Sequence, residues 1–155
     1  NVLLLGDEAV LADYGLATPT AGPLTPCPRH GTAEYCAPEV FQGALTDRSD
    51  QFSFAVMYCV LRSGRFPFPA PPPPGQLRGY VRPAPDLSAL PAAERVPVSR
   101  ALSPIPQNRF TSCTELMGHL LPALGLRRRL LDDGRFVIEP AAAVVPEPPK
   151  SKMFK

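Results

Sequence analysis

The stretch from Asp13 to Glu39 opens with Ala-Asp-Tyr-Gly-Leu-Ala at residues 12–17 and closes with Gly-Thr-Ala-Glu-Tyr-Cys-Ala-Pro-Glu at residues 31–39. Between these motifs, residues 18–30 contain four prolines, three threonines and one glycine without any periodicity. Such a composition predicts a loop. We therefore expect the rest of the chain to hold this segment in place.

A β-hairpin is predicted just before this stretch. Residues 2–5 and 9–12 are two short apolar runs on either side of Gly-Asp-Glu, a turn-rich centre. Residue numbers that pair across a hairpin have a constant sum, so a turn centred on Asp7 places Asn1 opposite Asp13. We expect the open end of the hairpin to bring these two oxygen-bearing side chains together.

A helix inside the domain is predicted over residues 49–62. Ser49 and Asp50 can cap its N-terminus, and Gly64 follows as the stop signal. Residues 52–61 are apolar nearly all round the helix. Such a pattern is typical of a helix that lies inside a domain rather than on its surface.

Shorter helices are predicted further along the chain. Residues 87–102 are expected to form two helical pieces, interrupted by Pro91 and Pro97. Ser-Cys-Thr-Glu at residues 112–115 has the spacing of a capping box, and apolar side chains then fall on one face of a helix that ends at Gly125. The predicted fold class is therefore mainly α, with one small N-terminal β-hairpin.

The C-terminal residues 127–155 differ in composition from the rest of the chain. They begin with three arginines and become alanine- and proline-rich towards their end. We expect a basic, proline-rich tail or linker there, with the option of a short strand at residues 135–138. Residues 1–126 are expected to form the folded unit.

Composition and charge argue against several classes of protein. The 155 residues carry a net charge of +2, which is too small to indicate a nucleic acid or an anionic membrane surface as a partner. No apolar run approaches the roughly 20 residues of a membrane span. The four cysteines are irregularly spaced, so we interpret them as reduced, mostly buried thiols of a cytoplasmic protein rather than as a zinc site.

Asn1 and Asp13 form the strongest chemical pair in the sequence. Magnesium prefers oxygen ligands and keeps several waters, so one carboxylate and one amide oxygen beside nucleotide phosphates can suffice to bind it. The alternative reading has no metal: Asn1 is then a loop cap, and Asp13 ends a strand next to Gly15.

The order of these motifs resembles that of protein kinases. An asparagine, an apolar strand, a turn and a second strand lead to Asp-Tyr-Gly at residues 13–15, which is similar to the metal-binding Asp-Phe-Gly of that family, with Tyr14 in place of phenylalanine. Ala-Pro-Glu at residues 37–39 matches the close of the kinase activation segment. The preceding Gly31 and Thr32 resemble the serine/threonine branch, and the short, alanine- and proline-rich sequence resembles the bacterial type.

The resemblance implies both a fold and an activity. Residues 1–126 would be the C-terminal lobe of a serine/threonine protein kinase, with residues 13–39 as its activation segment, and the enzyme would transfer the ATP γ-phosphate to hydroxyl groups of a protein substrate. Asn1 and Asp13 would bind ATP and Mg²⁺. Thr32 would contact the catalytic aspartate and lysine, which precede Asn1, the aspartate by about five residues.

The resemblance also implies structural roles for three residues. Arg109 would pair with Glu39 through the two arms of its planar guanidinium. Asp50 would accept backbone hydrogen bonds from the catalytic loop at the start of the buried helix. Taken alone, Arg109 fits a solvated surface charge, and Asp50 fits an ordinary helix cap.

Thr18, Thr20 and Thr25 are candidate phosphorylation sites, because they lie in the predicted loop. A phosphate there can order the chain by pairing with arginines. At least two of the three also fit plain, solvent-exposed loop residues.

Two functional hypotheses follow from these observations. In the first, the chain is part of an active kinase and is inactive alone, because the glycine-rich loop, the strand lysine and the catalytic aspartate of such enzymes are not in it. In the second, it belongs to a pseudokinase or a proline-rich interaction module that transfers no phosphate. The residues that precede Asn1 in the whole protein would distinguish the two.

Overall fold

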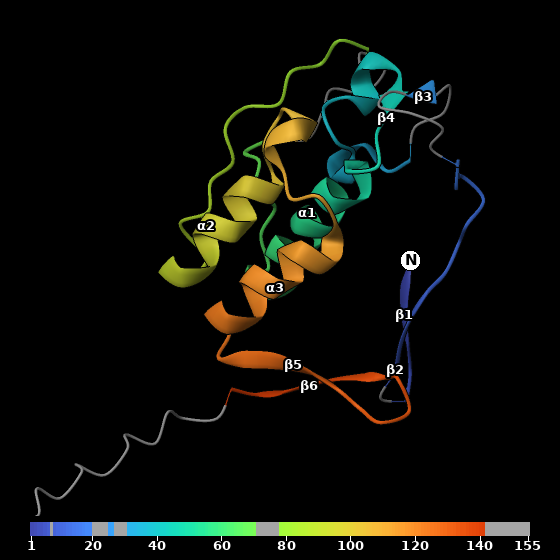
Figure 1. The fold of residues 1–155 in the computed structure, drawn as a ribbon. Helices are drawn as coiled ribbons and strands as arrows, with labels where there is room; N and C mark the ends of the chain where they lie inside the picture. Colours follow the sequence, from blue (N-terminus) through green and yellow to red (C-terminus); the bar gives the residue numbers. More distant parts are fainter. Residues whose placement is uncertain (7, 20–24, 27–30, 71–77, 142–155) are drawn as a thin grey trace, which may run out of the picture.

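The computed structural model of the protein describes residues 1–6, 8–19, 25–26, 31–70 and 78–141. The strands in this part of the chain are β1 (Val2–Leu5), β2 (Glu8–Leu11), β3 (Thr25–Pro26), β4 (Ala44–Leu45), β5 (Leu126–Leu130) and β6 (Phe136–Pro140). The α-helices are α1 (Ser49–Ser63), α2 (Ala92–Ala101) and α3 (Cys113–Ala123), and the short 3₁₀ helices are η1 (Ala33–Tyr35), η2 (Val40–Gln42) and η3 (Pro106–Asn108). Figure 1 shows the α-helices packed together, with the hairpins β1–β2 and β5–β6 projecting beyond them.

Strands β1 and β2 form an antiparallel hairpin whose register differs by one residue from the prediction. The Ala12 amide donates to the Asn1 carbonyl at 2.9 Å, so Asn1 lies opposite Ala12 and not opposite Asp13. The reason is the turn. Glu8 already belongs to the paired strand, and Gly6 has a φ of 63°, so the connection is only two residues long and matches the hairpin twist.

Strand β3 corrects the prediction of an unbroken loop over residues 18–30. Thr25 pairs with Leu45 and Pro26 with Ala44 in an antiparallel arrangement. A two-residue strand has no periodicity of its own, because its partner comes from a distant part of the chain. The sequence pattern of residues 18–30 therefore does not reveal this strand.

Helix α1 crosses the core, with its most buried face towards the core and its last turn exposed. Phe52 and Val56 are 1% and 0% exposed, whereas Leu61 is 76% exposed. Every residue from 51 to 60 is buried or half-buried, as expected for a helix that lies inside the domain. The predicted end of the helix at Gly64 is confirmed, because Gly64 has a φ of 70° and its amide donates to the Val60 carbonyl at 2.8 Å.

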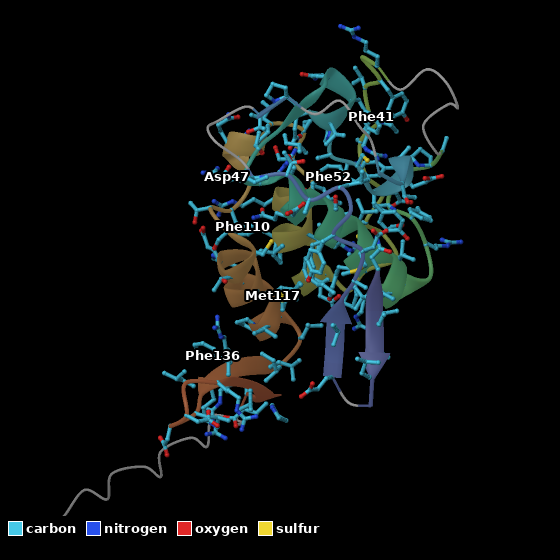
Figure 2. All side chains as sticks on the ribbon, turned by 90° about the vertical axis from the view of Figure 1, so that its right-hand side faces the viewer. Phe41, Asp47, Phe52, Phe110, Met117 and Phe136 are labelled. Carbon is cyan, nitrogen blue, oxygen red and sulfur yellow. The ribbon has the colours of Figure 1, made fainter. Side chains whose placement is uncertain are left out.

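The hydrophobic core lies between α1, α2, α3 and the segment around η2. Figure 2 shows Phe41, Phe52 and Phe110 within this part of the molecule. The rings of Phe52 and Phe68 stack with their centroids 5.9 Å apart. The buried apolar side chains of the core are Cys36, Ala37, Val40, Phe41, Phe52, Ala55, Val56, Cys59, Phe68, Leu90, Val98, Ala101, Leu102, Phe110, Leu116 and Leu120.

Helix α2 is continuous, whereas two interrupted pieces were predicted over residues 87–102. It starts after Pro91 and contains Pro97 in its interior. A proline there removes the hydrogen bond to the carbonyl of Ala93 and normally bends or breaks a helix. Pro97 and Val98 are both buried, so packing against the core outweighs the local preference.

Helix α3 begins with half of the predicted capping box. The Ser112 hydroxyl accepts a hydrogen bond from the Glu115 amide at 3.1 Å. The Glu115 carboxylate reaches back to the Thr111 amide at 2.8 Å, one residue earlier than the capping box requires. The helix is followed by Gly125, which has a φ of 68°, so its predicted end is also observed.

The hairpin β5–β6 corrects the prediction of a tail that begins at residue 127. Its strands pair antiparallel from Leu126 with Pro140 to Leu130 with Phe136. Gly134 in the turn has a φ of 81°. Strand β6 includes residues 136–138 of the short strand that was an option at residues 135–138. Strand β5 was missed because its three consecutive arginines were interpreted as the start of a basic tail. Residues 142–155 of the predicted tail lie outside the described residues.

In the part of the chain that the structure describes, no helix combines the length and the apolar character needed to cross a membrane. Cys36 and Cys59 are buried, Cys113 is exposed, and Cys27 lies outside the described residues. Burial raises the pKa of the Cys59 thiol to about 11, so it stays protonated near neutral pH.

Candidate functional site

Glu39 and Arg109 form a buried ion pair between distant parts of the chain. Glu39 directly precedes η2, and Arg109 directly follows η3. Each of two guanidinium nitrogens, Nη1 and Nη2, donates to a different carboxylate oxygen at 2.7 Å. The Arg109 side chain is fully buried, and that of Glu39 is 6% exposed. This bidentate geometry joins the end of the 13–39 segment to the loop before α3.

Two neutral side chains complete the surroundings of the Glu39 carboxylate. The hydroxyls of Ser49 and Thr46 donate to Glu39 Oε1 at 2.7 Å and 3.5 Å, and the Ser49 hydroxyl also accepts from the Thr46 amide at 2.9 Å. Burial raises the pKa of Glu39, but the hydrogen bonds and positive charge of Arg109 lower it by more, so the net pKa lies below the ordinary value. The carboxylate is therefore held charged inside the protein.

Gln51 fixes the chain next to this pair, and no sequence motif marks it. Its side-chain amide donates to the Phe110 carbonyl at 3.1 Å and accepts from the Phe110 amide at 3.0 Å. Gln51 lies on α1 and is 1% exposed. The residue after Arg109 is thus tied to the same helix that supplies Ser49.

Arg82 is a second residue that sequence reasoning missed. Its Nη2 donates to the carbonyls of Ala33, Glu34 and Cys36 at 2.6–2.9 Å, and its Nε also donates to Cys36 at 3.0 Å. Its guanidinium carbon lies 4.7 Å from the ring centroid of Phe68. This cation fixes the backbone of η1, which is the closing part of the 13–39 segment.

Glu94, Tyr58 and Arg62 form a further polar cluster that was not predicted. The Tyr58 hydroxyl donates to Glu94 Oε2 at 2.7 Å, and Arg62 donates to both oxygens at 3.0–3.3 Å. Burial and the negative charge of Glu94 raise the pKa of Tyr58. The cluster joins α1 to α2 and lies apart from the predicted site residues in sequence.

Asn1 and Asp13 both lie exposed at the open end of the β1–β2 hairpin. They are neighbours across the hairpin rather than directly opposite residues. Asp13 has a φ of 63°, and its Oδ1 accepts from the Gly15 amide at 3.3 Å. Two exposed oxygen-bearing side chains fit a hard cation that keeps water and phosphate ligands. Among the described residues, no group of three or more metal-binding side chains is found.

Thr32 directly precedes η1 and Asp50 lies in the first turn of α1. The contacts predicted for both are with residues before Asn1. Thr32 is exposed just before η1, and its carbonyl accepts from the Tyr35 amide at 3.0 Å. Asp50 is exposed in the first turn of α1, and its carboxylate makes no hydrogen bond with another described residue. Their predicted roles stay predictions.

The three candidate phosphorylation sites differ in their surroundings. Thr18 is exposed, and its hydroxyl donates to the Leu16 carbonyl at 3.2 Å. Thr25 is half-buried in β3, which makes it less accessible than a loop residue. Thr20 lies outside the described residues.

Three proline-rich receptor-like protein kinases of Arabidopsis thaliana are similar in sequence to this chain. PERK11 is 37% identical over 116 residues, which cover 71% of this chain and 16% of PERK11. PERK13 is 46% identical over 71 residues, covering 43% of this chain and 10% of PERK13, and PERK6 is 48% identical over 63 residues, covering 39% and 9%. The chain spans less than a fifth of the length of each relative.

These partial matches relate the chain to protein kinases. No family model matches the sequence. The relatives come from a plant, so the bacterial type that the composition indicates stays a prediction.

Proposed function

We propose that this chain is part of the C-terminal lobe of a serine/threonine protein kinase, a cytoplasmic enzyme that transfers the ATP γ-phosphate to protein hydroxyl groups. The observation that carries the proposal is the buried pair of Glu39 and Arg109. The motif resemblance assigns this pair to two residues 70 positions apart, and the two side chains meet with both hydrogen bonds formed. The similarity to three protein kinases supports it independently.

In the proposed enzyme, Asn1 and Asp13 hold Mg²⁺ together with the phosphates of ATP. The metal supplies charge neutralisation for the phosphates during transfer. The exposure of both side chains leaves them accessible to a nucleotide. The ion pair and Arg82 have a different task, because they fix the closing end of the segment that Asp13 begins.

The test uses the full-length protein, including all residues that precede Asn1. We expect it to transfer ³²P from labelled ATP to a serine/threonine substrate such as myelin basic protein, and Asp13→Asn to lower kcat at least about 100-fold, as loss of transition-state charge stabilisation does. Asparagine keeps the left-handed backbone accessible, so folding is retained. The matched control is Glu8→Gln, an exposed carboxylate on β2.

Two results would refute the proposal. Equal turnover in Asp13→Asn and Glu8→Gln would remove the metal assignment. Phosphate transfer by residues 1–155 alone would contradict the view that the preceding residues are required. A full-length protein that binds partners but transfers no phosphate would instead establish the pseudokinase alternative.

A further inference from the structure

The β5–β6 hairpin is a two-stranded sheet, so among the described residues the outer edge of each strand lacks a strand partner. Within the described residues, β6 pairs with β5 alone. Helix α3 packs against β5, so β6 is the outer strand of the projecting hairpin (Figure 1). A two-stranded hairpin is marginal in water, and further strands stabilise it. The outer edge of β6 is therefore open to another strand.

The hydrogen-bond pattern shows which groups of β6 face this open edge. The Leu131 amide donates to the Arg135 carbonyl at 2.7 Å, and the Ala141 amide donates to the Gly125 carbonyl at 2.8 Å. Hydrogen-bonded pairs in an antiparallel ladder recur at every second residue. Odd-numbered residues therefore point their backbone groups inward, and the even-numbered residues 136, 138 and 140 point theirs outward.

Charge distinguishes the two edges of the hairpin. Strand β5 carries three consecutive arginines, residues 127–129, and charged residues on an edge discourage strand pairing. The single charge of β6 is Glu139, whose carboxylate accepts from Arg127 at 2.9 Å and from Arg129 at 2.8 Å. Both of these contacts lie within the hairpin, and they lower the pKa of Glu139. The β6 edge is thus apolar and locally neutralised.

A second copy of β6 fits this edge in the antiparallel direction. A two-fold axis at Ile138 places Ile138 opposite itself and Phe136 opposite Pro140, with no like charges facing each other. The outward groups then form four hydrogen bonds between the strands, because Pro140 offers a carbonyl but no N–H. The same operation on β5 would set Arg128 against Arg128, which is repulsive.

The apolar side of the hairpin becomes continuous in such a pairing. Leu130, Phe136 and Ile138 are 58%, 51% and 51% exposed and belong to the even-numbered face of the hairpin. Figure 2 shows Phe136 on this projecting hairpin, away from the core phenylalanines. Arg128 covers the Phe136 ring at 3.2 Å from its centroid. Residues directly opposite in an antiparallel pair point to the same side of the sheet, so two copies merge their apolar faces.

We propose that β6 is a self-association edge, through which two copies of the chain join antiparallel into a four-stranded sheet of order β5-β6-β6-β5. The partner is a second copy because both the charges and the hydrogen-bond positions of β6 are compatible with themselves. This inference does not depend on the proposed kinase activity.

The test is a disulfide trap in the full 155-residue chain. Cys27→Ser and Cys113→Ser remove the one exposed native thiol and the one outside the described residues. Ile138→Cys then places two thiols at the axis, where opposite Cα atoms lie about 5.5 Å apart, a distance that a disulfide spans. We expect oxidised glutathione to convert this variant to a covalent dimer, with two glutathione thiols released per disulfide.

The matched control is Arg128→Cys, which lies on the same face but on β5. It should stay monomeric under the same oxidation, and equal crosslinking of both variants would overturn the proposal. Sedimentation of the unmodified chain gives a second readout. We expect its mass to rise towards twice the chain mass with concentration, Ile138→Lys to abolish the rise and Leu130→Lys to keep it. A single chain mass at every concentration would also overturn the proposal.

Discussion

At the scale of single residues, the Glu39–Arg109 pair determines how much stability a substitution at the site costs. A buried ion pair adds little net stability, since desolvation of both charges offsets their attraction. Removal of one partner is costly, because the other charge then stays buried and uncompensated. The pair is thus a constraint on which residues the site tolerates more than a source of stability.

Arg109→Met tests this constraint. It leaves the Glu39 carboxylate buried without a cation, so we expect the free energy of unfolding to fall by about 3–5 kcal/mol. Arg129→Met is the matched control, since Arg129 is 52% exposed and its partner Glu139 keeps Arg127; its expected loss is less than about 1 kcal/mol. Urea denaturation measures both, and equal losses would contradict the assigned role.

The pH dependence of stability tests the same carboxylate. The folded pKa of Glu39 lies below its ordinary value of 4.5, so its contribution to stability is complete above that value and is lost as the pH falls through the folded pKa. We expect the unfolding free energy of the native chain to fall more steeply below pH 4.5 than that of Glu39→Gln. Parallel curves for the two proteins would show that Glu39 does not titrate as described.

The sequence predicted this pair and missed the other buried polar residues for a physical reason. Glu39 and Arg109 belong to motifs, and the resemblance supplied their pairing. Arg82 bonds to backbone carbonyls, and any segment of the chain can offer these, so no residue pattern marks its target. Buried Glu94 pairs with exposed Arg62 across 32 positions, and a single sequence does not reveal such a pairing.

At the scale of elements, local sequence signals predicted the ends of helices more reliably than the pairing of strands. Gly64 and Gly125 both end helices in the left-handed conformation, as predicted. The predicted register of β1–β2 was wrong by one residue, because the length of the turn sets the register and the position of its centre does not. The β5–β6 hairpin was missed because pairing depends on both strands, and β6 was only an option.

Ser112→Ala tests the start of α3. The Ser112 hydroxyl satisfies one of the free amides of the first turn, so we expect its loss to lower stability by about 1 kcal/mol. Ser99→Ala on the exposed side of α2 is the control and should change stability by less than about 0.5 kcal/mol. Thermal or urea unfolding compares them. A similar shift for both would mean that the cap contributes nothing specific.

At the scale of the whole molecule, the N-terminal hairpin is the least covered part of the described chain. Leu3, Leu4, Leu5 and Leu11 are 52%, 76%, 64% and 62% exposed. Leu4 and Leu11 lie on one face of the hairpin and Leu3 and Leu5 on the other, because successive residues of a strand point to opposite faces. Exposed apolar faces of this kind mark surfaces that bind something else. In the proposed enzyme, the residues before Asn1 are the candidates to cover it.

Leu4→Lys tests whether the face that Leu4 shares with Leu11 acts as an apolar patch. Leu61→Lys on α1 is a close control, because Leu61 is also 76% exposed but is not part of the hairpin. We expect Leu4→Lys to lower the fluorescence of the apolar dye anilinonaphthalene sulfonate bound to the native chain, and Leu61→Lys to change it little. Equal reductions would mean that the hairpin holds no continuous patch.

The distance in sequence between Glu39 and Arg109 also has a consequence for biosynthesis. A ribosome makes the chain from its N-terminus, so Glu39 leaves the exit tunnel long before its cation exists. Domains fold as units once their distant contacts can form. The end of the 13–39 segment therefore acquires its buried partner only when the loop before α3 has emerged, and a nascent chain arrested before Arg109 should stay sensitive to proteases around Glu39.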